Sequence, residues 1–194
     1  MKSYHFVGAT LRDGRPVPPD GEWLEHAGPC VMCESGLHAS RHPFDALRYA
    51  PGSTLCLVEC EDVVEEVSDK LVCRRRKIVR RIDATELLRR FARQQAIKVL
   101  HLWNAPQVVR DYLATGDESL RSAARSAAWL AEASAERTAA WSAARSAARA
   151  AASAEEAVRS AASAEEAVRS AASAEEAVRD EFAAMVDEAM GGAK

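Results

Sequence analysis

The chain has 194 residues and a formal net charge of −3. This length allows one medium-sized domain or a small domain with an extension, and the weak charge excludes a strong general attraction to nucleic acid or membranes. No stretch approaches the roughly 18–20 apolar residues that span a bilayer, and the first residues, MKSYHFVGAT, lack the apolar run of a signal peptide. We therefore expect a cytoplasmic protein whose five cysteines are free thiols.

The first part of the chain carries short strand and helix patterns separated by turn-rich segments. In chain order it predicts a strand in 2–11, a short strand in 36–40, a helix over 42–50 with Pro43 in its first turn, an apolar strand over 53–61, a basic strand over 69–82, a helix from Asp83 to about Trp103 and a short helix from Pro106. These elements predict a small N-terminal mixed α/β head of the α+β class.

The composition changes sharply near ATGDES, residues 114–119. All seven prolines lie at or before Pro106, and neither Gly nor Pro occurs between Gly116 and Gly191. We place the head at 1–116, an alanine-rich helical tail at 117–190 and a disordered terminus at 191–194.

The tail contains a ten-residue repeat, AASAEEAVRS, that favours an α-helix. Alanine is the strongest helix former, and Glu155 stands four residues before Arg159, the favourable order for an ion pair along a helix. The whole tail as one helix would be a rod on the order of 110 Å long, and a helical hairpin is the alternative. The ten-residue period is not a heptad, so the pattern does not predict a leucine zipper.

An alanine helix buries little surface, so its few large apolar residues are candidate contact points. We predict that the tail self-associates as a homo-oligomer, or acts as a spacer. The candidate oligomerisation residues are Trp129, Leu130 and Trp141 near its start and Phe182, Met185 and Val186 near its end.

Two groups in the head could bind a ligand. The spacing C-x2-C-x4-H-x3-H, which permits a zinc site, is formed by Cys30, Cys33, His38 and His42. The alternative is that the cysteines are ordinary thiols in a loop and the histidines have structural roles.

The run CRRRKIVRR places Arg74, Arg76 and Arg80 on one face of a strand and further cations on the other. This pattern predicts an edge strand or protruding ribbon. The alternatives are that residues 74–81 bind phosphate, in a nucleic acid or a nucleotide, or that they pair with the acidic tail of a neighbouring chain.

Residues 33–61, CESGLHASRHPFDALRYAPGSTLCLVECE, resemble uncharacterised phage and prophage proteins that carry a Cys-Glu-Ser-Gly-[Phe/Leu]-His-Ala motif. The matching residues are Cys33 to Ala39, then Val58-Glu59 and Asp69-Lys70, and members often continue into Ser-Ala-Ala runs, as this chain does from Ser122. The resemblance covers residues 1 to about 103. It implies a phage-type accessory protein of unknown activity in a bacterial host cell.

The order of YHFV, GLHAS, ALRYA and TLCLVE is also similar, at the level of fold, to NAD-dependent ADP-ribosyltransferases. This resemblance implies that His5 binds the ribose side of NAD and that His38 takes the stacking position on nicotinamide. The late glutamate of that superfamily has no clear counterpart, because Glu66 and Asp69 are poor candidates. A shared fold would not by itself show that the activity is shared.

No P-loop, G-x-G-x-x-G or H-E-x-x-H motif is present, and no complete catalytic set can be assembled. We therefore predict a non-enzymatic interaction protein whose head is a binding surface, with no cofactor and with a protein partner. The alternatives are an NAD- or nucleotide-binding domain, using His5, His38, Arg74, Arg76 and Arg80, and a small zinc module.

Overall fold

The computed structural model describes residues 1–102, 104–132 and 175–191. The chain divides into two compact units. The first, here called the sheet domain, comprises Met1–Ala84 together with Arg179–Lys194, and the second, the helical domain, comprises Thr85–Val178. The sheet domain therefore takes up both ends of the chain.

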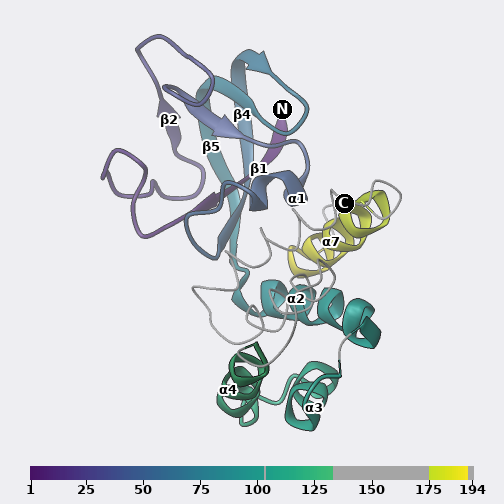
Figure 1. Cartoon of the computed structure of the whole chain (residues 1–194). Helices are drawn as coiled ribbons and strands as arrows, with labels where there is room; N and C mark the ends of the chain where they lie inside the picture. Colours follow the sequence, from purple (N-terminus) through teal and green to yellow (C-terminus); the bar gives the residue numbers. More distant parts are fainter. Residues whose placement is uncertain (103, 133–174, 192–194) are drawn as a thin grey trace. The chain divides into compact units, whose positions relative to one another are not determined.

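The sheet domain contains five antiparallel strands. They are β1 (Lys2–Val7), β2 (Trp23–Glu25), β3 (Leu37–Ala39), β4 (Thr54–Glu66) and β5 (Leu71–Asp83). Their order is β1-β4-β5-β2, and β3 pairs with β5 beside β2 (Figure 1). The framework is the hairpin of β4 and β5, which is 13 residues long on each side and bulged in two places.

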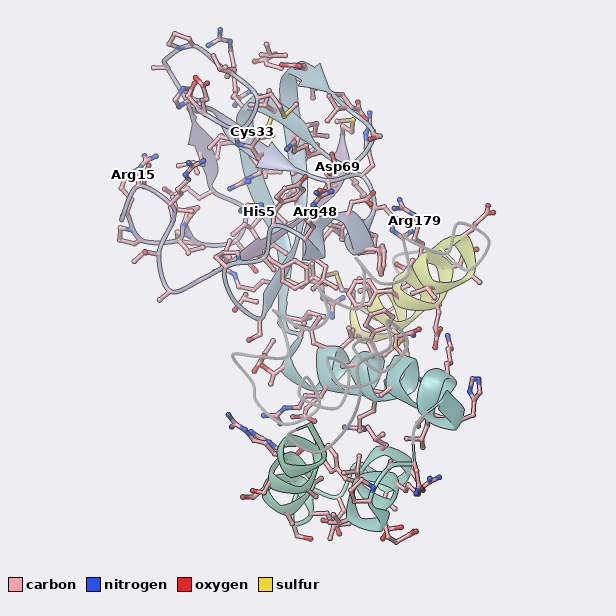
Figure 2. The ribbon with its side chains drawn as sticks, in the orientation of Figure 1. His5, Arg15, Cys33, Arg48, Asp69 and Arg179 are labelled. Atoms are coloured by element: carbon pink, nitrogen blue, oxygen red, sulfur yellow. The ribbon has the colours of Figure 1, made fainter. Side chains whose placement is uncertain are left out.

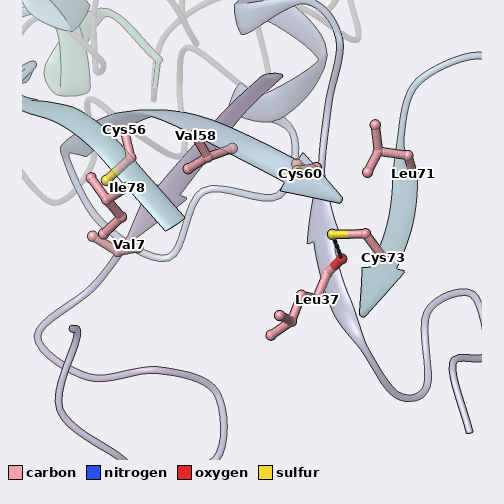
Figure 3. Close-up of a cluster of buried hydrophobic side chains, with 9 residues drawn as sticks. Val7, Leu37, Cys56, Val58, Cys60, Leu71, Cys73 and Ile78 are labelled. Atoms are coloured by element: carbon pink, nitrogen blue, oxygen red, sulfur yellow. Dashed lines mark hydrogen bonds between the residues drawn. The ribbon is translucent and has the colours of Figure 1, made fainter. Parts of the chain in front are cut away.

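Both faces of the sheet are covered. One buried cluster joins four strands, and Met1, Val17 and Leu24 pack against it (Figure 3); its members are Val7, Leu37, Ala39, Cys56, Val58, Cys60, Leu71, Cys73 and Ile78. Neighbouring residues of a strand point to opposite faces, so Phe6, which is also buried, belongs to the other face. There α1 (Pro43–Leu47) packs against β1.

The C-terminal helix α7 (Glu175–Ala189) joins the sheet domain from Arg179 onward. The rings of Phe44 and Phe182 meet edge to face at 6.1 Å, and both side chains are fully buried. Arg179 binds the buried carboxylate of Asp45 through two hydrogen bonds, one of 2.8 Å from Nη2 to Oδ2. The guanidinium of Arg80 donates to the carbonyl of Met190.

The basic strand is an inner strand, so its interpretation as an edge or protruding ribbon is wrong. β5 lies between β4 on one side and β2 and β3 on the other. Its cations are tolerated there because neighbouring segments supply acids. Arg75 contacts Glu25 and Glu61, Lys77 contacts Glu59 at 2.6 Å, and Arg81 contacts Asp20.

The helical domain contains α2 (Thr85–Val99), a 3-10 turn (Leu100–Leu102), α3 (Gln107–Thr115) and α4 (Arg121–Glu132). Gly116 ends α3 in the left-handed conformation, at φ +69°, and its N–H donates to the carbonyl of Tyr112. The core of the helical domain combines small and large side chains, which are Ala96, Ala105, Val109, Tyr112, Leu113, Ala124 and Ala128. None of the described helices is long and apolar enough to cross a membrane.

The expected fold class, a mixed α/β head followed by a long rod or helical hairpin, is therefore wrong. The described part of the expected tail forms two separate helices with different partners: α4 packs on α3, and α7 packs on the sheet domain. The physical reason is that the large apolar side chains of α7 are buried against the sheet domain. An isolated alanine-rich helix could not bury them. Residues 133–174, which hold most of the repeats, lie outside the described residues.

Candidate functional site

The segment CESGLHA, residues 33–39, folds into a tight turn that leads into β3. The backbones of Val31 and Ser35 form an antiparallel bridge, and the Ser35 hydroxyl donates to the carbonyl of Pro29. The turn requires left-handed backbone at Cys33, where φ is +67°, and at Gly36, where φ is +106°. Only the second position holds a glycine, so the backbone at Cys33 is strained.

Three contacts hold Cys33. Its N–H donates to Nε2 of His38 at 3.0 Å, and its carbonyl accepts from Arg12 at 3.1 Å. Its exposed sulfur lies 2.9 Å from Nζ of Lys70, in the turn between β4 and β5. The hydrogen bond to Cys33 raises the pKa of Lys70, so this lysine is an ammonium ion at neutral pH.

Lys70 also connects the turn to the end of α1. Its Nζ lies 4.7 Å from the centre of the Tyr49 ring, and the Tyr49 hydroxyl donates to Asp69. Arg48 lies 3.5 Å from the same carboxylate (Figure 2). The hydroxyl and the cations hold the pKa of Asp69 below its usual range, although burial opposes them. An exposed sulfur, two cations, a carboxylate and an aromatic ring thus lie together at this turn.

His5, His38 and Arg76 form a second cluster, in which both histidines are half-buried. Arg76 is buried on β5 and donates to the carbonyl of His38. Burial lowers the pKa of His5 well below its usual value, and the charge of Arg76 and the neighbouring His38 lower it further. The pKa of His38 is lowered by burial first and then by Arg76 and Lys70. Both histidines are therefore neutral at pH 7.

These lowered values predict a pH dependence of stability. His5, His38 and also His42, whose pKa burial lowers, bind protons less readily when folded. Below about pH 6.5 the unfolded chain takes up protons that the folded chain does not, so its free energy of unfolding falls. Each unit of lowering contributes about 1.4 kcal/mol once the pH is below the folded value. Urea denaturation should show constant stability above pH 7 and a decline from pH 6.5 to 5.

The matched variant is His5→Asn, which removes one of the three groups without adding a charge. Its stability should decline less than that of the wild type over the same interval, whatever its absolute value. Equal declines in the two proteins would show that His5 titrates normally in the folded state.

Three cysteines line the same side of the sheet as Arg76. Cys56, Cys60 and Cys73 are fully or nearly fully buried, and Cys73 Sγ donates to the carbonyl of Leu37 at 3.3 Å (Figure 3). Burial raises the pKa of Cys56 to about 11. A hydrogen bond between Cys60 and Cys73 lowers the pKa of the first and raises that of the second. Arg76 favours the thiolate at each of them.

The four candidate zinc residues do not come together. The sulfur of Cys33 accepts a hydrogen bond from Lys70, whereas Cys30 Sγ donates to the carbonyl of Cys73 at 3.7 Å. His42 accepts the N–H of Phe44 and caps α1. Among the described residues, no three side chains of His, Cys, Asp or Glu are grouped to hold a metal ion.

The remaining candidates make internal contacts. Arg74 donates to the carbonyl of Gly28 at 2.9 Å, and Arg80 donates to Met190. Phe182, Met185 and Val186 are buried, so their apolar face is already covered within one chain. The side chains of Trp129 and Leu130 and the whole of Trp141 lie outside what the structure describes.

The sequence analysis did not place Lys70 and Tyr49 beside Cys33. These residues are 37 and 16 positions away along the chain, and only the pairing of β3 with β5 brings the two turns together. The resemblance to phage proteins, which remains a prediction, named both the motif at Cys33 and Asp69-Lys70 but did not predict that they lie together.

The comparisons with known proteins give a family match over the first part of the chain. No curated protein matches the chain, and no solved structure matches it. Residues 1–90 match a family described as a domain of unknown function, DUF7666. The matched segment contains all five strands and α1 and ends within α2.

Proposed function

We propose that this chain is a non-enzymatic binding protein whose sheet domain recognises a segment of a partner protein. The recognition surface, here called the hairpin-end surface, consists of Val31, Tyr49, Val63, Val64 and Val67 around the turn between β4 and β5. The single observation that carries the proposal is the gathering of these exposed apolar side chains at one place.

Each of the five side chains keeps between 38% and 50% of its exposure. Among the described residues, only two other large hydrophobic side chains are as exposed, Val79 and Ile97. Contacts of Lys70 tie part of the surface together: its ammonium reaches the Tyr49 ring and Cys33, two residues after Val31, and its carbonyl accepts from the N–H of Val67. Val63 and Val64 lie near the end of β4, just before the same turn. Exposed apolar groups gathered in this way are typical of interaction sites.

The charge around this surface identifies the chemistry of the partner. The strand end EDVVEE, residues 61–66, carries four acids. Arg75 and Arg41 neutralise Glu61 and Glu66. Asp62 and Glu65 make no ion pair with any residue the structure describes. The complementary partner is therefore a segment that presents apolar side chains next to Lys or Arg, since like charges would repel a second copy of this surface.

The test begins with a library of random peptides displayed for selection on the immobilised full-length protein. Selected peptides should combine apolar residues with Lys or Arg. Their affinity is then measured by fluorescence anisotropy for the wild type and for Val64→Asp. We expect the variant to bind at least about tenfold more weakly, which equals about 1.4 kcal/mol.

The matched control is Val79→Asp, a valine of similar exposure on the same hairpin. Its affinity should stay within about twofold of the wild type. Peptides without positive charge, or equal binding to both variants, would contradict the proposal. So would a dimer in sedimentation analysis that Val64→Asp dissociates, because the occupant would then be a second copy.

The other candidate functions gain no comparable support. Three of the six cations in residues 74–81 pair with Glu59, Glu61 and Asp20. The other three, Arg74, Arg76 and Arg80, donate to backbone carbonyls. The NAD-, nucleotide- and zinc-binding alternatives remain predictions from the sequence.

A further inference from the structure

The last six residues of β4 are paired on one side only. β1 pairs with residues 54–59 of β4, and the backbone of Met1 then exchanges two hydrogen bonds of 2.8 Å with Cys60. Over residues 61–66, β5 is the only strand that pairs with β4 among the described residues. The other side of residues 61–66, here called the open edge, therefore has backbone groups without a strand beside them in the part of the chain that the structure describes.

The open edge is exposed to solvent. Residues 62–66 are all exposed, whereas residues 71–73 of β5, which pair with this end of β4, are fully buried. The two strands differ because β3 pairs with β5 at this level, while no described strand lies on the other side of β4. Six extended residues span about 20 Å, which is the usual length of a strand.

The open edge has features that discriminate between possible occupants. Asp62 has left-handed backbone, at φ +52°, and a bulge lies between Val63 and Glu65. Bulges and charged side chains protect an edge against pairing with another copy of itself. Asp62 and Glu65 make no ion pair with any described residue, so a second copy would be repelled and a strand that carries Lys or Arg would be attracted.

We propose that the open edge accepts an extended segment of the partner as an additional strand, in which apolar and basic residues alternate. This inference rests on the proposed function, because it concerns the same surface and specifies how the partner binds there. Backbone hydrogen bonds supply affinity in this mode, and side chains supply specificity. Successive side chains of a strand point to opposite faces, so alternation gives the added strand one apolar and one basic face.

The probe is a labelled seven-residue peptide of alternating lysine and valine, capped at both ends, and its affinity for the full-length protein is measured by fluorescence anisotropy. In an added strand every second N–H points to β4, and the others point away from it. N-methylation should therefore weaken binding at least about tenfold at alternate positions and less than about threefold at the positions between them. The corresponding peptide of glutamate and valine should bind at least about tenfold more weakly.

Hydrogen exchange of the protein provides a second measurement. At saturation with the lysine peptide, alternate amides within residues 61–66 should exchange about tenfold more slowly or less, since their N–H groups become hydrogen-bonded. The amides of α3 are the internal control and should keep their rates.

Glu65→Lys reverses a charge on the open edge and should weaken binding of the lysine peptide about fivefold or more. Its matched control is Glu22→Lys, at an exposed acid just before β2, and this variant should bind within about twofold of the wild type.

Three results would overturn strand addition: no binding of the lysine peptide, N-methylation effects without a period of two, or unchanged exchange of residues 61–66 in the complex. Peptides from the library that still depended on Val64 would then leave the proposed function standing, with a different mode of binding. A library selection that yields no such peptide would remove both proposals together.

Discussion

Replacing Phe182 with Ala should lower the free energy of unfolding of the sheet domain by about 3–5 kcal/mol. Phe182 is fully buried and its ring packs edge to face on Phe44, more than 130 positions earlier in the chain. The substitution leaves a cavity between α7 and α1 and removes an aromatic pair. Urea denaturation, followed by hydrogen exchange of the β4 and β5 amides, measures the loss in the sheet domain itself.

The control for this prediction is Val79→Ala, which truncates an exposed side chain of the same domain. Its effect should lie within about 0.5 kcal/mol. If Phe182→Ala left the protection of β4 and β5 unchanged, α7 would not be part of the sheet domain. The buried ion pair of Asp45 with Arg179 would then also have no structural role.

Replacing Gly36 with Ala should destabilise the sheet domain by about 2–4 kcal/mol, through backbone strain and overpacking together. Gly36 has φ +106°, and a Cβ added there would lie 2.5 Å from Cγ2 of Val72 and 3.1 Å from Sγ of Cys30. Val72 is fully buried and cannot move aside. Thermal or urea denaturation of the full chain gives the measurement.

Gly14→Ala separates the two causes. Gly14 has φ +83°, but no heavy atom lies within 4 Å of its added Cβ. This variant should therefore lose only the strain, about 1–2 kcal/mol. Equal losses at both positions would show that Val72 yields, and that the turn of the CESGLHA motif is held less tightly than the contacts indicate.

The local elements of the sheet domain were predictable because their patterns are local. The strand over 2–11 corresponds to β1, the helix with Pro43 in its first turn to α1, and the apolar and basic strands to β4 and β5. β2 was missed because three residues in a segment rich in Pro and Gly carry no periodicity. Only their pairing with residues 75–77 of β5 makes them a strand.

The errors came from long-range contacts. The face of Phe182, Met185 and Val186 indicated an apolar stripe, but nothing in the sequence named Phe44 as its cover. Similarly, the cations of β5 suggested an edge because their acidic partners are on other segments, Glu25 and Glu59 among them. The juxtaposition of Cys33 with Lys70 depends on the register of β3 against β5.

The return of α7 to the sheet domain gives residues 85–178 the topology of an insertion, anchored at both ends. The contacts of α7 with the sheet domain begin at Arg179, at the end of the repeats. Gains or losses of whole AASAEEAVRS units would therefore leave the spacing between Arg179 and Phe182, and so their fit to Asp45 and Phe44, unchanged. The chain can thus vary its length between generations without any substitution in the sheet.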